Sequence, residues 1–149
     1  MKLSTKGRYG LRAMIDLSIN AKGQQVALYS IAERQNISVS YLEQVFSLLR
    51  KSGLVNSIKG AQGGYFLADD PSDITVGRIL RALEGDLSIV DESNEDFEQD
   101  KKSIEYCLKI NVWDKINESI NKVVDTMTLQ DLVEEYQEMN GTDNLMFYI

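Results

Sequence analysis

The sequence has no histidine and only one cysteine, one proline and one tryptophan among its 149 residues. Histidine is the most common general base and a frequent metal ligand, so its absence removes the usual centre of hydrolytic and metal-dependent chemistry. The sequence also offers no nucleophile–base pair and no spacing typical of a metal site. We therefore do not expect an enzyme. The lone Cys107 cannot form a disulfide within the chain.

Long apolar runs are also missing. No stretch approaches the roughly 20 apolar residues that span a membrane. The first residues carry Lys2, Lys6 and Arg8 without the apolar core of a signal peptide. We expect a cytoplasmic protein. A chain of 149 residues is long enough for one ordinary domain, or two small ones, with a core that needs no disulfides.

Charge is divided unevenly along the chain. Residues 1–67 contain nine Lys or Arg and three acids, a net charge of +6, whereas residues 68–149 contain seven against twenty, a net charge of −13. The total of −7 therefore hides a basic half and an acidic half. This asymmetry predicts a module that binds a polyanion, joined to an acidic portion with another role.

Two short helices are predicted in the basic half. Their start signals are two pairs with capping-box spacing, Ser30 with Glu33 and Ser40 with Glu43. Asn36 lies between the pairs and tolerates the left-handed backbone conformation that a tight turn between helices needs. This spacing is typical of a helix-turn-helix.

The second of these helices has two different faces. Four apolar residues recur at helical spacing and predict a buried stripe: Leu42, Val45, Phe46 and Leu49. The other side carries groups that can meet base edges and phosphates: Ser40, Tyr41, Glu43, Gln44, Ser47 and Lys51. A solvated polar face without a ligand is the alternative, since most amphipathic helices have one.

A first helix is predicted over residues 6–21. Four apolar residues fall at helical spacing there and complete a three-helix core: Leu11, Met14, Ile15 and Ile19. The residues at and before its start are basic or carry hydroxyl groups: Lys2, Ser4, Thr5, Lys6 and Arg8. Free backbone N–H groups and the helix dipole favour an anion at such a position, so we expect contacts with a phosphate.

A glycine-rich stretch, IKGAQGGYF at residues 58–66, follows Gly53, which we expect to end the second helix. LVNSI and GYFLA have the content of two short strands. A nucleotide phosphate loop would lead its glycines into a helix, whereas these lead into a strand. The hairpin is expected to be the wing of a winged helix, with Lys59 directed toward the DNA backbone or the minor groove. A plain hairpin with one exposed lysine is the alternative.

Residues 103–127 predict a long helix with an apolar stripe. Its members are Ile104, Leu108, Val112, Ile116, Ile120, Val123 and Met127. A helix of this length cannot be buried by its own small domain, so we expect it to pack against the same helix of a second chain in a twofold dimer. Such a dimer predicts an inverted-repeat operator. Packing within one chain is the alternative.

Three stretches together resemble a family of bacterial regulators. They are MKLSTKGRYGLRAM at the start, IAERQNISVSYLEQVFSLLRKSGLVNSIKGAQGGYFLA at residues 31–68 and ITVGRILRALEG at residues 74–85. They are similar to the Rrf2 family of winged-helix transcription regulators, closely over residues 1–85 and more loosely beyond. The resemblance implies a mainly α fold with a small β wing. With the patterns above, and with the lack of apolar periodicity in residues 91–102, it predicts a winged helix-turn-helix domain at 1–85, a flexible acidic loop at 86–102, and a dimerisation helix and C-terminal tail at 103–149.

The same resemblance implies which residues contact DNA. Recognition-helix positions that meet the major groove correspond to Ser38, Ser40, Tyr41, Glu43 and Gln44, and the wing-tip position that enters the minor groove corresponds to Lys59. The amino-terminal segment that contacts phosphates corresponds to Lys2, Ser4, Thr5, Lys6, Arg8 and Tyr9. Arginine is frequent at the wing tip, and lysine there keeps the charge but loses the planar guanidinium.

Iron–sulfur members of the family hold their cluster with three cysteines and a nearby histidine after the wing. Cys107 matches the third cysteine, Ile110 stands at the histidine position, and acids and amides occupy the other positions. A cluster needs about three or four such ligands, so we predict no cluster and no cofactor. We expect Cys107 to be a small apolar residue on a packed helix. A thiol that senses oxidants is the alternative. The positive charge of Lys109 would lower the pKa of such a thiol, whereas the negative charge of Glu105 would raise it.

The chain ends in NLMFYI, after a short predicted helix TLQDLVEEY that Thr128 caps and a break at Gly141. Apolar residues at a mobile terminus indicate docking, and a terminal carboxylate fits a pocket that captures C-termini. The residues concerned are Met146, Phe147, Tyr148 and Ile149. The ending is similar to that of a cysteine-metabolism repressor of the family, which implies cysteine synthase as a partner that O-acetylserine displaces. Packing of the tail on the dimer is the alternative.

We therefore expect a homodimeric, DNA-binding repressor of cysteine or sulfur metabolism genes, gated by cysteine synthase. One alternative is a thiol-redox or iron–sulfur-linked regulator of the same family that senses through Cys107. An alternative of another class is a protein-interaction module that does not bind DNA.

Overall fold

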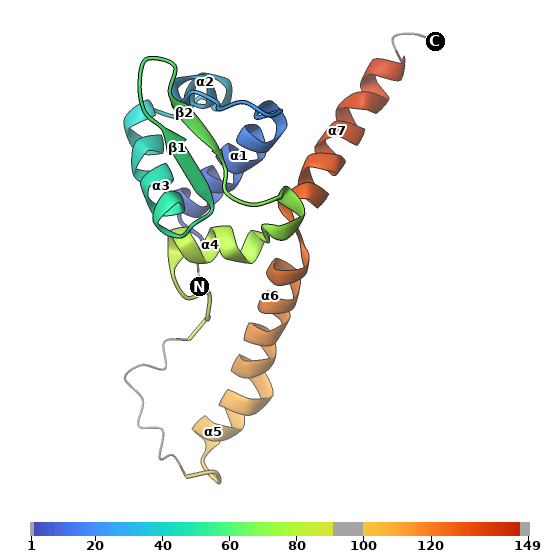
Figure 1. Cartoon of the computed structure of the whole chain (residues 1–149). Helices are drawn as coiled ribbons and strands as arrows, with labels where there is room; N and C mark the ends of the chain where they lie inside the picture. Colours follow the sequence, from blue (N-terminus) through green and yellow to red (C-terminus); the bar gives the residue numbers. More distant parts are fainter. Residues whose placement is uncertain (1, 91–99, 147–149) are drawn as a thin grey trace.

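The computed structural model describes residues 2–90 and 100–146 (Figure 1). The elements are α1 (Thr5–Asn20), α2 (Leu28–Gln35), α3 (Val39–Lys51), β1 (Val55–Ile58), β2 (Gly64–Leu67), η1 (Pro71–Asp73), α4 (Val76–Glu84), α5 (Ile104–Leu108), η2 (Lys109–Trp113), α6 (Asp114–Thr126) and α7 (Leu129–Met146). β1 and β2 pair antiparallel, with Val55 opposite Leu67 and Ile58 opposite Gly64. The predicted mainly α fold with a two-stranded wing is confirmed.

The main core lies between the first four helices and the hairpin, and Leu129 joins it from α7. All four apolar residues predicted on α3 are buried in it. Tyr65 of β2 packs its ring on that of Phe46 with 4.8 Å between the ring centroids, which fixes the wing to α3. The wing is therefore held by the core and does not depend on its two strands alone.

On α1, the predicted stripe lies partly on the buried face: Met14 is fully buried, and Leu11 and Ile15 are half-buried against the core, but the most buried positions are shifted from it. The buried face contains Ala13, Met14 and Leu17, together with Gly7 and Gly10. The physical reason is α4, which crosses this helix so closely that a Cβ on Gly10 would lie 2.1 Å from Leu83. Glycines carry no hydrophobic signal, so the apolar pattern could not mark the face on which α4 packs.

The helix-turn-helix is present, although its helices begin at other residues than predicted. α2 follows Ala27, which offers no side-chain cap, and the hydroxyl of Ser38 caps α3 by accepting from the Tyr41 amide at 3.2 Å. The capping boxes at Ser30 and Ser40 were therefore wrong, because both serines lie inside helices. The turn itself is confirmed: Asn36 has φ 55°, in the left-handed region.

The predicted helix over 103–127 is confirmed as a continuous helical run through α5, η2 and α6. With α7 it forms a long arm beside the winged-helix unit, and α5 lies at its far end (Figure 1). No helix in the described part of the chain is long and apolar enough to cross a membrane.

The joint between α6 and α7 is tied to the start of α4. Val76 donates its amide to the carbonyl of Met127 at 2.9 Å, and Leu129 donates to the carbonyl of Ile74 at 2.7 Å. The Leu129 side chain is fully buried in the main core. The C-terminal helices are thus anchored in the same core as the winged-helix unit.

α7 begins as predicted and ends later. Thr128 accepts from the Asp131 amide at 3.1 Å, and Asp131 accepts from the Thr128 amide at 3.0 Å, so the cap is confirmed. The break at Gly141 was wrong, because the helix continues to Met146. Glycine lowers helix propensity by only about 1 kcal/mol, which does not by itself end a helix.

Candidate nucleic-acid interface

The outer face of α3 carries the polar residues that the sequence predicted. Ser40, Glu43 and Gln44 are exposed, while Tyr41 is half-buried and meets the ring of Tyr9 edge-on with 6.0 Å between centroids. Ser38 is exposed but uses its oxygen to cap the helix. The exposed hydroxyl, carboxylate and amide groups thus point away from the core on a helix that the core holds rigidly.

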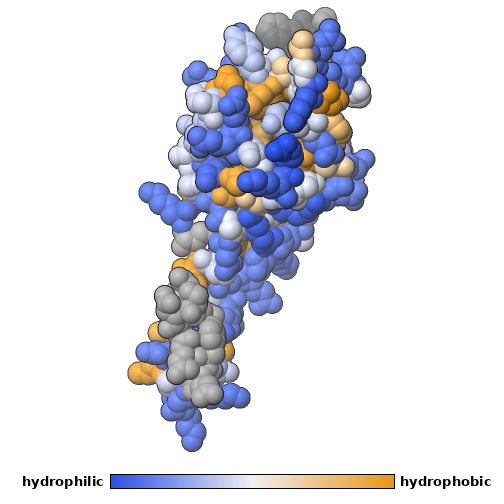
Figure 2. All heavy atoms as spheres, turned by 60° about the vertical axis from the view of Figure 1, so that its left-hand side comes forward, coloured by the Kyte–Doolittle hydropathy of each residue, from blue (hydrophilic) through white to orange (hydrophobic). Residues whose placement is uncertain are grey.

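Two hollows join this face to α1 and to the wing. The first is bordered by Lys6 together with Ser40, Glu43, Gln44, Ser47 and Leu48. The second is bordered by Glu43, Ser47 and Arg50 on α3 and by residues of the hairpin that include Ser57, Lys59 and Gly60. Because Glu43 and Ser47 border both hollows, one continuous surface runs from Lys6 across α3 to Lys59. Figure 2 shows hydrophilic residues over much of the molecule's face, with apolar residues in separate patches.

The wing loop has the geometry of a tight hairpin. Gly60 has φ +117°, a conformation that L side chains rarely adopt, and its carbonyl accepts from the amide of Gly63 at 3.0 Å. A Cβ on Gly63 would lie 2.3 Å from the carbonyl oxygen of Ile58. These glycines therefore serve the turn, and they leave the exposed Lys59 at its edge.

The amino-terminal segment lies on the same side as α3, with one difference from the prediction. Lys2, Thr5 and Arg8 are exposed, and Lys6 is half-buried. The backbone amides of Ser4 and Gly7, however, are not free, because both donate to Glu84 of α4, at 3.0 and 2.9 Å. The expectation of an open set of amides for a phosphate was thus wrong at these two positions.

Glu84 has a pKa below its ordinary value. Burial alone would raise this pKa, but the hydrogen bonds from Ser4 and Gly7 outweigh that effect, and the charge of Lys6 adds to the lowering. The carboxylate is therefore ionised at neutral pH.

A buried ion pair lies behind the helix-turn-helix. The side chain of Asp16 is 3% exposed and receives Arg34 Nη2 on Oδ1 at 2.7 Å and Arg34 Nε on Oδ2 at 2.9 Å. Gln35 Nε2 also donates to Oδ2, at 2.9 Å. The hydrogen bond to Asp16 raises the pKa of Arg34, despite some burial. The pair fixes the end of α2 on α1, immediately before the turn at Asn36.

Two residues of this region were missed from the sequence. Arg50 is exposed and borders the hollow toward Lys59, whereas the prediction placed Lys51 on this face. Arg50 lies three residues after Ser47 and seven after Glu43, and this helical spacing could have placed it on the same face from the sequence. Glu84 gave no signal, because its partners lie about 80 positions away in the sequence.

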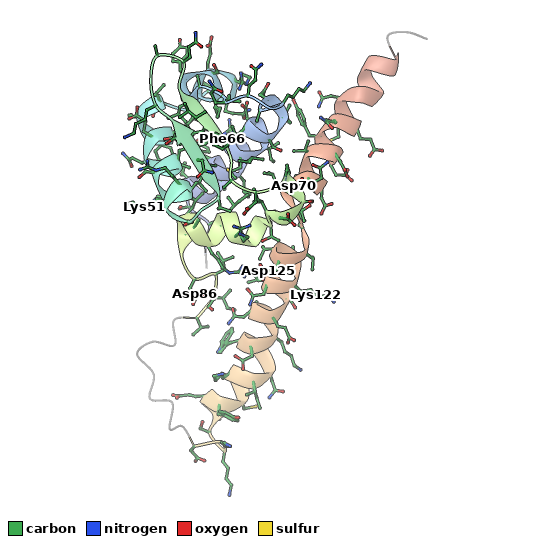
Figure 3. All side chains as sticks on the ribbon, in the orientation of Figure 1. Lys51, Phe66, Asp70, Asp86, Lys122 and Asp125 are labelled. Carbon is green, nitrogen blue, oxygen red and sulfur yellow. The ribbon has the colours of Figure 1, made fainter. Side chains whose placement is uncertain are left out.

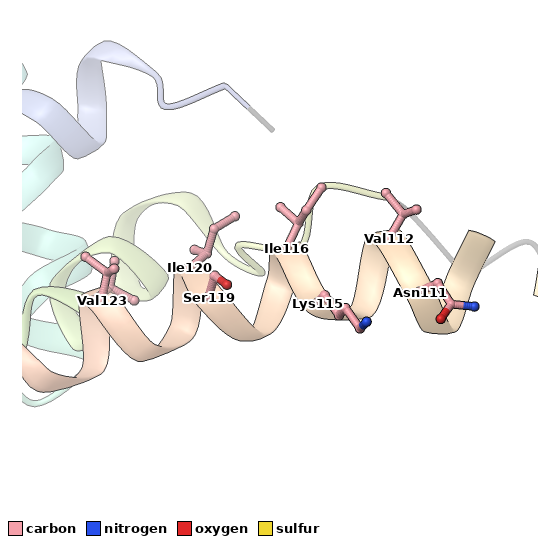
Figure 4. Close-up of a pocket in the computed structure, with 8 residues that line it drawn as sticks. Asn111, Val112, Lys115, Ile116, Ser119, Ile120 and Val123 are labelled. Carbon is pink, nitrogen blue, oxygen red and sulfur yellow. The ribbon is translucent and has the colours of Figure 1, made fainter. Parts of the chain in front are cut away.

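The apolar side chains of α6 divide between two surroundings. Ile120 and Val124 pack on Val76, Leu80 and Leu87. Ile116 is 40% exposed and Val123 is 57% exposed. They line an open groove of about 600 Å³, whose wall also includes the outer parts of Ile120 and Val124 (Figure 4). Packing within the chain therefore covers only part of the predicted stripe.

The remaining predicted residues lie away from this surface. Cys107 is exposed on α5, so its expected burial on a packed helix is not found within one chain. Phe147, Tyr148 and Ile149 lie outside the described residues, as does most of the predicted acidic loop. Within residues 2–90 and 100–146, no three His, Cys, Asp or Glu side chains are grouped to hold a metal ion.

Comparison with known proteins gives a consistent result over nearly the whole chain. The sequence pattern of the family described as "Rrf2: Iron-dependent Transcriptional regulator" matches residues 3–135. The HTH-type transcriptional regulator CymR of Bacillus subtilis is 44% identical over 149 residues, covering 100% of both chains. A solved structure of CymR, described as the global cysteine regulator of B. subtilis, covers 91% of this chain and 98% of its own with a TM-score of 0.75. The structure of T. potens IscR is 45% identical, covers 93% and 90%, and has a TM-score of 0.72.

Proposed function

Since the chain belongs to the Rrf2 family of transcriptional regulators, we propose that it is a cytoplasmic, dimeric, sequence-specific DNA-binding repressor of cysteine or sulfur metabolism genes. The observation that carries this proposal is the continuous surface from Lys6 across α3 to Lys59. The similarity to CymR over the full length supports cysteine metabolism as the regulated process.

In this proposal α3 lies in the major groove. The amide of Gln44 can form two hydrogen bonds with adenine, and the carboxylate of Glu43 can accept from the amino group of cytosine. The hydroxyl of Ser40 can donate to or accept from a base. Lys59 and Arg50 flank this face and supply positive charge toward the backbone or the minor groove. Lys2, Lys6 and Arg8 add phosphate contacts from α1.

The second chain of the dimer would lie along α6. A groove lined mainly by apolar residues that include the exposed Ile116 and Val123 favours association through apolar contact. A twofold axis at this helix would set two α3 helices about one DNA turn apart, or a multiple of it, and would require an inverted-repeat operator.

Titration of labelled duplexes followed by fluorescence anisotropy tests the DNA-binding function. We expect specific binding to an inverted repeat upstream of cysteine-metabolism genes and a steep loss of affinity between 50 and 200 mM salt, as is typical of several phosphate contacts. Lys59→Ala should weaken binding to all duplexes and reduce the salt slope by about one unit per protomer. Lys122→Ala, on α6 (Figure 3), is the matched control and should change neither. A folded protein that ignores every duplex at low salt would contradict the proposal.

No iron-dependent step is part of this function. An iron–sulfur cluster needs about three or four thiolate or imidazole ligands. The chain has one cysteine and no histidine. The side-chain amide of Asn111, which donates to the carbonyl of Cys107 at 2.9 Å and approaches its sulfur at 3.6 Å, is not a cluster ligand. The donor set thus does not fit a cluster.

The proposed signal reaches the protein through its C-terminal tail. When cysteine synthase lacks substrate, its active site would bind the last four residues of the chain, Met146, Phe147, Tyr148 and Ile149. O-acetylserine would then displace this tail. Deletion of Tyr148 and Ile149 should abolish enzyme binding, measured by calorimetry, and leave DNA binding by the regulator alone unchanged. Undiminished enzyme binding would refute the scheme.

A second candidate signal is oxidation of the exposed thiol of Cys107. Cys107 is exposed on α5, where an oxidant can reach it. If it is a sensor, mild peroxide should change the DNA affinity of the wild-type protein and leave Cys107→Ser unaffected. An equal response of both proteins would exclude this role.

A further inference from the structure

The first turn of α1 is capped by a side chain from another helix. Oε1 of Glu84 accepts from the amide of Ser4 at 3.0 Å, the hydroxyl of Ser4 at 2.6 Å and the amide of Gly7 at 2.9 Å. Ser4 is the N-cap residue, yet its side chain makes no capping bond of its own. The last residue of α4 therefore takes over the task that a helix normally assigns to its own N-cap.

The contact depends on the local geometry of both helices. A Cβ on residue 7 would lie 2.5 Å from Oε1 of Glu84, so glycine is required for this approach. Three donors converge on one oxygen of an ionised carboxylate, and hydrogen bonds to charged groups are the stronger kind. Glu84 is thus a built-in anion at the start of α1.

This cap controls the segment on which the phosphate contacts depend. The first turn of a helix frays when its amides have no partner. Lys6 and Arg8 lie within the turn that Glu84 holds. The negative charge of Glu84 also repels a DNA phosphate from the amides of Ser4 and Gly7. Phosphate contacts in this segment are therefore left to the side chains of Lys6 and Arg8.

α4 is in turn attached to the long arm. Arg81, one turn before Glu84, donates to Asp125 at 3.0 Å and to Asn121 at 2.9 Å on α6. Figure 3 shows Asp125 on the part of α6 that lies beside α4. One short helix therefore connects the proposed dimerisation helix to the start of α1.

We propose that Glu84 is a positioning residue for DNA binding, which holds the first turn of α1 in the conformation from which Lys6 and Arg8 reach the phosphate backbone. The inference rests on the DNA-binding function proposed above. Glu84 itself touches no DNA, and its effect is exerted through the segment that it caps.

A mutant cycle on duplex affinity tests this inference. Glu84→Ala should bind the operator about tenfold more weakly. Without its cap the first turn of α1 frays in the free protein, and about one residue of its backbone must be ordered when DNA binds. In a background that carries both Lys6→Ala and Arg8→Ala, the same substitution should weaken binding by less than about twofold, since both contacts that it positions are already absent. Glu84→Gln keeps an acceptor at the same place and should bind within about twofold of the wild type.

Asp70→Ala is the matched control. Asp70 also accepts from an amide and a hydroxyl, those of Ser72 at 2.9 and 2.7 Å, but these hydrogen bonds cap η1 and not α1. We expect it to bind DNA like the wild type. Should Glu84→Ala be unfolded at the assay temperature, Gly7→Ala takes its place, because the new methyl group displaces the carboxylate without removing it.

Two results would overturn the inference alone: wild-type affinity of Glu84→Ala, or an equal loss in the presence and absence of the Lys6 and Arg8 side chains, which is the mark of a purely structural role. Failure of the folded wild-type protein to bind any duplex at low salt would overturn the DNA-binding function as well. The two failures are therefore distinguishable.

Discussion

Arg34→Met should destabilise the protein far more than its surface position indicates. The substitution leaves the carboxylate of Asp16 buried, with its side chain 3% exposed and with only neutral donors from Gln35 and Asn20. A methionine retains most of the apolar stem of Arg34, so the change isolates the lost charge and hydrogen bonds.

The magnitude follows from the burial of the two partners. Removal of one member of a buried ion pair typically costs about 3–5 kcal/mol. Because the side chain of Arg34 is 40% exposed, water screens the pair and replaces part of it. We therefore expect a loss of about 2–3 kcal/mol in the free energy of unfolding. For a chain of 149 residues this corresponds to a decrease in Tm of about 6–10 °C.

Urea denaturation at pH 7, followed by far-ultraviolet circular dichroism, measures this loss. Arg78→Met is the matched control, because its pair with Asp69 has both side chains at least 40% exposed and should contribute less than about 1 kcal/mol. The double variant Asp16→Leu with Arg34→Met removes both charges and should recover most of the stability. A loss below about 0.5 kcal/mol for Arg34→Met, or no recovery in the double variant, would refute the reasoning.

Three further predictions concern the wing, the arm and pH. Gly63→Ala should distort the hairpin, since its Cβ would lie 2.3 Å from a backbone oxygen, and should weaken DNA binding in the anisotropy assay with little change in Tm. Ile116→Glu on the exposed side of α6 should give a folded monomer by light scattering, whereas Ile120→Glu should lower Tm because that residue packs on α4. Glu84 has a lowered folded pKa, so its contribution to stability is present above its ordinary value of 4.5 and is lost as the pH falls through the folded pKa. The urea midpoint of the wild type should therefore fall more than that of Glu84→Gln between pH 7 and pH 3, and parallel curves would contradict this.

Features of the fold that depend on near neighbours were predictable from the sequence. The left-handed turn at Asn36, the apolar stripe of α3 and the hairpin at Gly60 are set by local conformational preference or by periodicity. Helix starts were less predictable, because Ser38 and Ser40 both precede apolar residues and only packing selects the cap. Contacts between distant residues had no signal at all: the charge of Asp16 and that of Glu84 gave no indication of a partner.

The candidate interface followed the same division. Residues on one helix face, such as Glu43 and Gln44, could be assigned from spacing alone. The capture of the Ser4 and Gly7 amides by Glu84 could not, since it requires the crossing of α4 over α1. The continuity of the surface from Lys6 to Lys59 likewise depends on how three separate elements meet.

The backbone hydrogen bonds that join Val76 to Met127 and Leu129 to Ile74 make the α6–α7 joint a pivot. Two helical segments extend from it: α6, which leads away toward α5, and the part of α7 beyond Val133, where residues 134–140 are exposed. A partner that binds either segment would act on residues 127–129, which are hydrogen-bonded to the start of α4, the helix that carries Glu84. Amide hydrogen exchange should accordingly be slow at this pivot and fast along the outer part of α7, which would identify the arm as rigidly mounted and free at its tip.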